Sequence, residues 1–216
     1  MSRTWGLGLL AVLLTACQGT AVKSPPPATA QSPGELARLI AEDAKKSDQE
    51  SDAKVREALA ADALSKAQAC IGLAPVDAGC LYYDGVALGL DARAHPSRAL
   101  ETLKAMLVAL QGAEAKDPAY DQAGPSRVRA LVLIRAPGWP VGPGDAESGL
   151  AAAKRAVMLK PDYPPNVLAL AEALAKNGDA HGAQENYQRA RDMATQSSSA
   201  DRDDWIKQAE QGLKRP

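Results

Sequence analysis

Apolar residues recur every three or four positions along most of the chain, which is the pattern of helices with one buried face. Residues 53–73 show it clearly, with Ala63, Ala67 and Cys70 on one face. Pro75 then ends this segment, because proline cannot continue a helix. Helices are expected on the same grounds at residues 35–46, 53–73, 78–90, 97–110, 145–160, 164–176, 179–195 and 200–213. The pattern therefore predicts an all-α fold.

The middle of the chain departs from this pattern. Residues 126–136 are dense in apolar side chains and fit either a buried helix or a strand. Residues 137–144 (Pro-Gly-Trp-Pro-Val-Gly-Pro-Gly) must be irregular, because their prolines lack the N–H groups that regular structure requires. Asp145 follows as a helix N-cap. We expect an irregular Pro/Gly/Trp insert between two helical halves.

Small residues in the C-terminal half follow the spacing of the tetratricopeptide repeat, which has about 34 residues per unit. They are Gly149, Ala156, Ala171, Ala183 and Ala190. Small side chains at these positions let two antiparallel helices pack closely, and Pro161 falls at the end of one unit. An earlier unit fits less well, and the repeat breaks between residues 111 and 144. We expect a tetratricopeptide-like stack of antiparallel helix pairs, which leaves a concave face for binding.

The N-terminus has the features of an export signal. An uncharged, mostly apolar run from Trp5 to Ala16 follows Arg3, and it is shorter than the roughly 20 residues that cross a bilayer. Thr15, Ala16 and Cys17 resemble a bacterial lipobox, in which the cysteine is lipidated and begins the mature protein. The alternative is an ordinary signal peptide in which Cys17 is incidental.

These features divide the chain into three parts. Residues 1–16 are expected to be a lipoprotein signal peptide, and residues 17–34 a lipidated cysteine and flexible linker rich in Pro, Ala, Ser and Thr. Residues 35–216 are expected to form the helical domain. Gln18 after the lipidated cysteine favours the outer membrane, so we expect a lipid-anchored protein of the cell envelope that faces the periplasm. Its contact with the membrane would be through the anchor only.

Composition and charge limit the partners. The 25 basic and 26 acidic residues nearly cancel, and the chain has no dense basic block, so nucleic-acid binding is not expected. The absence of Phe, with only three Trp and five Tyr, agrees with a fold that lacks strands.

Cys70 and Cys80 remain once Cys17 is set aside. A pair of cysteines in an oxidising compartment is a disulfide candidate, and an intervening Pro75 allows two helices to bring them together. The alternative is a pair of small buried thiols. Either role is structural, because the spacing is not Cys-x-x-Cys.

The sequence offers no catalytic constellation. His95 and His181 lie in predicted turns without a second ligand at metal spacing, and no Gly-rich phosphate loop or nucleophile elbow occurs. We therefore expect no catalytic residues, no metal and no cofactor.

Three segments resemble a bacterial family of envelope lipoproteins. Tyr82–Leu90, Ala136–Gly142 and Pro161–Asn166 are similar to the tetratricopeptide T component associated with tripartite ATP-independent periplasmic (TRAP) transporters, over roughly residues 55–195. The resemblance implies an all-helical, non-catalytic accessory of solute transport, with a periplasmic solute-binding protein as its partner. The oligomeric state stays open.

Five residues are binding candidates. Trp139, flanked by two prolines, fits either a recognition surface or a plug in the core. Tyr82 and Tyr83 are adjacent helix positions about 100° apart, so one can pack while the other lines the groove. Asn166 and Glu172 are expected near the concave side.

The leading functional expectation is a non-catalytic interaction module that serves a TRAP-type transport system. The alternatives are a scaffold for outer-membrane assembly and a carrier of a small apolar ligand. A closed cavity lined by Tyr82 and Trp139 would favour the carrier, whereas an open groove would favour a protein partner.

Overall fold

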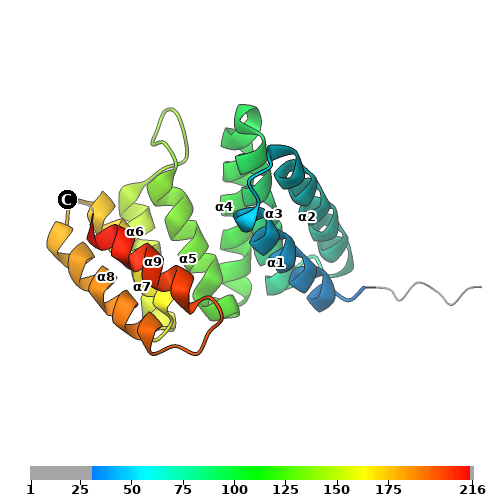
Figure 1. Ribbon diagram of the computed structural model, residues 1–216. Coiled ribbons are helices and arrows are strands. Elements are labelled where there is room, and N and C mark those ends of the chain that lie inside the picture. Colours follow the sequence, from blue (N-terminus) through cyan, green and yellow to red (C-terminus); the bar gives the residue numbers. More distant parts are fainter. Residues whose placement is uncertain (1–30, 215–216) are drawn as a thin grey trace, which may run out of the picture. The chain divides into compact units, whose positions relative to one another are not determined.

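The computed structural model describes residues 31–214, which fold into α-helices joined by short connections (Figure 1). The elements are α1 (Pro33–Gln49), α2 (Ala53–Leu73), α3 (Ala78–Ala94), the 3₁₀ turn η1 (Pro96–Arg98), α4 (Ala99–Lys116), α5 (Tyr120–Arg135), α6 (Ala146–Leu159), α7 (Pro164–Lys176), α8 (Ala180–Thr195) and α9 (Arg202–Leu213). No strand occurs in this part of the chain. The predicted all-α class is confirmed.

The helices form antiparallel pairs stacked side by side. Each odd-numbered helix packs against the even-numbered helix that follows it, from α1 with α2 to α7 with α8, and α9 closes the stack against α7 and α8. The odd-numbered helices also contact one another in the order α1, α3, α5, α7, α9, so they line one face of the stack. The expectation of stacked helix pairs is confirmed.

Aspartates begin several of these helices. The side chains of Asp52, Asp77, Asp145 and Asp179 each accept a hydrogen bond from a backbone N–H in the first turn of α2, α3, α6 and α8. Such N-caps satisfy donors that have no partner within the helix, and each contributes about 1 kcal/mol. Local sequence signals therefore define where these four helices start.

Small residues bring the paired helices close together. Ala153, Ala156, Ala171 and Ala190 are almost completely buried where α6, α7 and α8 meet. A Cβ atom at Gly149 would come within 2.5 Å of the Ile134 Cγ2 atom, so only glycine allows this approach of α6 to α5. The small-residue positions of the repeat are thus the close contacts of the stack.

The ambiguous segment 126–136 lies within α5 as far as Arg135 and packs against α6. The prediction that the repeat breaks entirely between residues 111 and 144 is therefore wrong. α5 and α6 form a helix pair like the others, and residues 136–145 are a long connection inside that pair. The sequence pattern failed here because the insert separates two helices that are spatial neighbours.

A disulfide joins Cys70 near the end of α2 to Cys80 in the first turn of α3, with 5.3 Å between the two Cα atoms. Both cysteines are fully buried and pack against Leu36 of α1. The bond links two helices of successive pairs at the N-terminal end of the stack.

Within residues 31–214, no helix has the length and apolar character needed to cross a membrane. The signal-peptide prediction, the lipidation of Cys17 and most of the predicted linker concern residues outside the described part of the chain.

Candidate functional site

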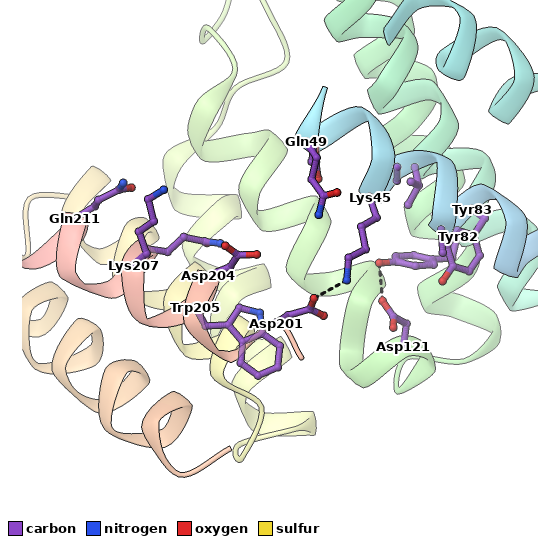
Figure 2. Close-up of a pocket in the computed structure, with 15 residues that line it drawn as sticks. Lys45, Gln49, Tyr82, Tyr83, Asp121, Asp201, Asp204, Trp205, Lys207 and Gln211 are labelled. Carbon is purple, nitrogen blue, oxygen red and sulfur yellow. Dashed lines mark hydrogen bonds and ion pairs between the residues drawn. The ribbon is translucent and has the colours of Figure 1, made fainter. Parts of the chain in front are cut away.

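A groove of about 790 Å³ lies on the face formed by the odd-numbered helices. α1 forms one wall and α9 the other, while α3 contributes the floor (Figure 2). The lining residues are Ala41, Ala44, Lys45, Asp48, Gln49, Tyr82, Tyr83, Val86, Asp121, Asp201, Asp204, Trp205, Lys207, Gln208 and Gln211. Charged and amide side chains dominate the walls, Tyr82 and Tyr83 lie at the floor, and Trp205 lies on the α9 wall.

An ion pair connects the two walls. Lys45 Nζ of α1 donates a hydrogen bond to Asp201 Oδ1 at the start of α9, at 2.8 Å (Figure 2). This hydrogen bond and the charge of Asp201 raise the pKa of Lys45. Asp201 occupies the N-cap position of α9 but makes no side-chain cap bond there. The Asp201 side chain instead reaches across the groove.

Tyr82 and Tyr83 take different roles at the floor. Tyr82 is 4 % exposed, and its hydroxyl donates to Asp121 Oδ2 at 2.7 Å. Tyr83 is partly exposed, with its ring edge-on to Tyr82 at 5.0 Å between centroids. Burial raises the pKa of both phenols, so both stay neutral and keep their protons. Of the two tyrosines, Tyr83 is the one placed to contact a ligand.

A left-handed turn positions Asp121. Asp121, Gln122 and Ala123 have φ values of 47°, 55° and 63°, a conformation that costs L-residues energy and is rare in succession. The turn is held by its partners: Tyr82 donates to the Asp121 carboxylate, and Arg127 donates to the Asp121 and Gln122 carbonyls at 3.2 and 3.1 Å. These bonds offset the strain and hold the Asp121 carboxylate at the groove.

Arg127 and Asn166 form a buried polar centre beneath this turn. Arg127 is 9 % exposed, and it donates to Asp121 Oδ2 at 3.0 Å and to Asn166 Oδ1 at 3.2 Å. Asn166 is fully buried, and its amide donates to the carbonyls of Gln122, Ala156 and Lys160 at 3.0–3.2 Å. The prediction that Asn166 binds a partner is therefore wrong, because internal bonds occupy the side chain and water does not reach it.

The same centre supports the opposite wall. The Arg127 guanidinium lies over the Tyr163 ring at 5.2 Å from its centroid, and the Tyr163 ring meets Trp205 edge-on at 5.6 Å. Trp205 in turn lines the groove from α9. A continuous set of contacts thus connects Tyr82 on the floor to Trp205 on the wall.

Glu172 lies apart from the main groove. Its carboxylate forms a bidentate pair with Arg135, with distances of 2.7 and 2.6 Å, and it lines a smaller depression of about 110 Å³. The structure does not bring Glu172 together with Tyr83 in one site.

Trp139 is also outside the groove. Its side chain is 90 % exposed, so it does not plug the core, and it is absent from the lining of either depression. Neither of these two depressions is lined by both Tyr82 and Trp139.

Neither histidine is placed for metal chemistry. His95 lies beside Asp91 and Glu57, and His181 beside Glu185. Residues 31–214 contain no group of three or more His, Cys, Asp or Glu side chains that could hold a metal ion.

Several groove residues were not anticipated from the sequence. Lys45, Asp121, Asp201, Trp205 and Gln208 belong to the first helix, the left-handed turn and the last helix. None matches a repeat position, and their proximity depends on how the stack curves. The last helix, α9, was expected only as a helix, and it supplies a wall of the groove.

The comparisons with known proteins support the fold. The crystal structure of TTC0263, a thermophilic tetratricopeptide (TPR) protein in Thermus thermophilus, matches with a TM-score of 0.64 and 22 % sequence identity, covering 86 % of this chain and 83 % of that one. No protein-family model and no curated protein matches this chain. The chain has a tetratricopeptide-like fold.

Proposed function

We propose that this protein is a non-catalytic interaction module that binds a segment of a partner protein in the groove between α1 and α9. The observation that carries the proposal is the groove itself, with tyrosines at its floor and mostly polar walls that include Trp205. Tyrosine and tryptophan supply large contact area at low entropic cost, and such residues dominate binding energy in protein interfaces.

The charge of the groove favours a peptide over an apolar small molecule. Lys45, Lys207, Asp48, Asp121, Asp201 and Asp204 all line it. An apolar ligand would leave these charges without new partners, which is unfavourable, whereas a peptide offers backbone amides and polar side chains. The carrier function is therefore the weaker alternative, and no observation favours the assembly scaffold.

The second part of the proposal concerns the cellular location of the protein and the identity of its partner. The lipobox-like residues up to Cys17 support a lipid anchor, on the outer membrane and facing the periplasm. The resemblance of three segments to the T component supports an accessory role in a TRAP-type solute transport system. The partner would then be the periplasmic solute-binding protein of that system.

Anchoring is tested by metabolic labelling with a radioactive fatty acid. The wild-type chain is expected to incorporate label and to fractionate with the outer membrane, and Cys17→Ser is expected to do neither. Unlabelled wild-type protein would contradict the anchor without affecting the groove.

Groove binding is tested by calorimetry with a purified TRAP solute-binding protein. Gln208→Trp fills the groove, whereas Glu210→Trp adds the same ring at an exposed α9 position outside it. We expect Gln208→Trp to weaken binding at least tenfold and Glu210→Trp to leave it unchanged. Equal affinities of the two variants for the solute-binding protein would contradict groove binding. If the wild type and both variants all fail to bind it, the transport role is contradicted.

A further inference from the structure

The groove between α1 and α9 already holds a cation that belongs to the protein itself. Lys45 extends from α1 across the groove to Asp201 at the start of α9 (Figure 2). The hydrogen bond to Asp201, together with the charges of Asp201 and Asp204, raises the pKa of Lys45. Lys45 therefore marks a point in the groove where a positive charge is stabilised.

Carboxylates outnumber cations at this end of the groove. Asp121, Asp201 and Asp204 line it, whereas the cations there are Lys45 and Arg127, which is buried beneath the floor (Figure 2). Both hydrogen bonds to the Asp121 carboxylate end on Oδ2, so Oδ1 has no donor within residues 31–214. No residue in that range donates to the Asp204 carboxylate either. This end keeps a negative charge and carboxylate oxygens that can accept further hydrogen bonds.

The other charges of the groove lie away from this end. Asp48 pairs with Arg93 of α3 at 2.6 Å. Lys207 lies six residues beyond Asp201 on α9, which is about 9 Å along the helix, and its side chain points away from Asp201 (Figure 2). The groove is therefore polarised, with its negative end where Lys45 meets Asp201.

Aromatic rings also lie at the negative end. Tyr83 and Trp205 line the groove, and the Tyr163 ring meets Trp205 edge-on at 5.6 Å between centroids. Aromatic faces attract cations, as the Arg127 guanidinium over the Tyr163 ring shows in this protein, at 5.2 Å from the ring centroid. A basic side chain entering the groove would find both carboxylate oxygens and aromatic rings.

The Lys45–Asp201 pair can be exchanged for another pair at small cost. Both side chains are about half exposed, and ion pairs of this kind contribute little to stability. Lys45 has a long, flexible stem. The Asp201 backbone is fixed, because its N–H donates to Ser199 Oγ and its carbonyl accepts from Trp205 N, each at 3.2 Å. Lys45 can therefore move into water while Asp201 stays in place.

We infer that the groove recognises its partner through a basic side chain, arginine or lysine, which replaces Lys45 at Asp201. The inference rests on the proposed function and names the chemistry of the segment that the groove binds. An acidic side chain at this point would meet Asp121, Asp201 and Asp204, and like charges brought together at an interface are strongly unfavourable. Lys45 acts as an internal competitor, which the basic side chain of the partner displaces.

The first test selects peptides from a displayed library of random heptapeptides. The target is the full chain with Cys17→Ser, and peptides that also bind Gln208→Trp, where the added ring fills the groove, are removed. We expect the retained peptides to share an arginine or lysine at one position, enriched over the input library. Enrichment of acidic residues, or no charge preference, would overturn the inference while groove binding stands. If no peptide requires an open groove, groove binding is contradicted together with the inference.

The second test measures the charge of the basic side chain by calorimetry. The best retained peptide is compared with a copy that carries citrulline in place of arginine, or acetyl-lysine in place of lysine. We expect the uncharged copy to bind about tenfold or more weakly. Asp201→Asn should remove most of this difference, whereas Asp203→Asn, an exposed α9 position outside the groove lining, should preserve it. Equal effects of the two variants would overturn the assignment of Asp201.

The third test concerns the competitor. Lys45→Met should bind the basic peptide about threefold or more tightly, because no internal cation has to leave. Lys46→Met removes the same charge from α1 outside the groove lining and should not change the affinity. A weaker affinity of Lys45→Met would show that Lys45 itself binds the segment, and would overturn the inference. Asp201→Asn and Lys45→Met should both keep the melting temperature within about 2 °C, so altered affinity does not reflect unfolding.

Discussion

Lys45 and Asp201 are 156 positions apart in the sequence, yet their side chains meet at 2.8 Å across the groove. The helices that carry them, α1 and α9, share no close backbone contact. Both side chains are about half exposed, so water and salt reach the pair. This bond therefore influences the width of the groove more than the stability of the fold.

Breaking this ion pair should open the groove without unfolding the protein. We expect Lys45→Met to keep the melting temperature within about 1 °C, because exposed ion pairs contribute little. Acrylamide should quench the fluorescence of Trp205 faster in this variant, measured in a Trp5→Phe/Trp139→Phe background where Trp205 is the only tryptophan. Salt at 1 M, where the Debye length is about 3 Å, should bring the Lys45 protein to the same quenching rate. Identical quenching at low salt would show that the pair does not restrict access.

Reduction of the disulfide should lower stability measurably. The bond closes a short loop, with a sequence separation of 10 between Cys70 and Cys80. Constraint of the unfolded chain by such a loop contributes about 2–3 kcal/mol. Cys70→Ala/Cys80→Ala should lose this amount in urea unfolding, and dithiothreitol should lower the melting temperature of the wild type only. A wild type insensitive to the reductant, with its thiols shown to be reduced, would contradict this expectation.

Asn166→Ala should destabilise the fold strongly. The change removes hydrogen bonds to Arg127 and to three carbonyl groups in a fully buried site, so each of those groups loses one of its partners where water cannot replace it. We expect a loss of about 2–4 kcal/mol in the free energy of unfolding. Glu172→Gln is the matched control on α7: it weakens a more exposed ion pair with Arg135 and should cost less than about 1 kcal/mol. Similar losses in both variants would show that the buried Arg127–Asn166 centre contributes no more to the free energy of unfolding than the exposed ion pair.

Asp84 should make stability depend on pH. Burial raises the pKa of this carboxyl above its ordinary value of 3.8, and no ion pair within residues 31–214 compensates it. The folded state therefore binds a proton more tightly than the unfolded state, so Asp84 weakens the fold as pH rises above that value. Asp84→Asn should stabilise the protein at pH 7, by up to about 0.5 kcal/mol, and should have no effect at pH 3. A variant less stable than the wild type at pH 7 would indicate that the carboxylate has a favourable partner.

The sequence predicts most of the fold because its signals are local. The spacing of apolar residues and the N-cap aspartates act within a few positions, and the small residues from Gly149 to Ala190 repeat at a fixed interval. The segment 126–136 could not be assigned in this way, because its apolar density fits two structures. Only its packing against α6 selects the helix.

The groove could be predicted only in outline. A concave face follows from the repeat, and Tyr83 was expected to contribute to it. The contacts of Arg127 with Asn166 and of Lys45 with Asp201 join residues 39 and 156 positions apart, and no periodic pattern encodes such pairs. Gly124-Pro125 marks a break in the helix, but the residue types of Asp121, Gln122 and Ala123 do not specify the left-handed turn that precedes it. Their conformation depends on Tyr82 and Arg127.

Each helix of the stack contacts mainly its immediate neighbours, from α1 to α9. The distance between α1 and α9 therefore depends on the small rotations that accumulate at every helix–helix interface between them. A change of packing at a single interface, such as the contact of Gly149 with α5, would rotate every helix that follows it. The resulting displacement of α9 relative to α1 would change the width of the groove. Mutations far from any bound segment can thus adjust which segment fits, and partner choice becomes a property of the whole array of helices.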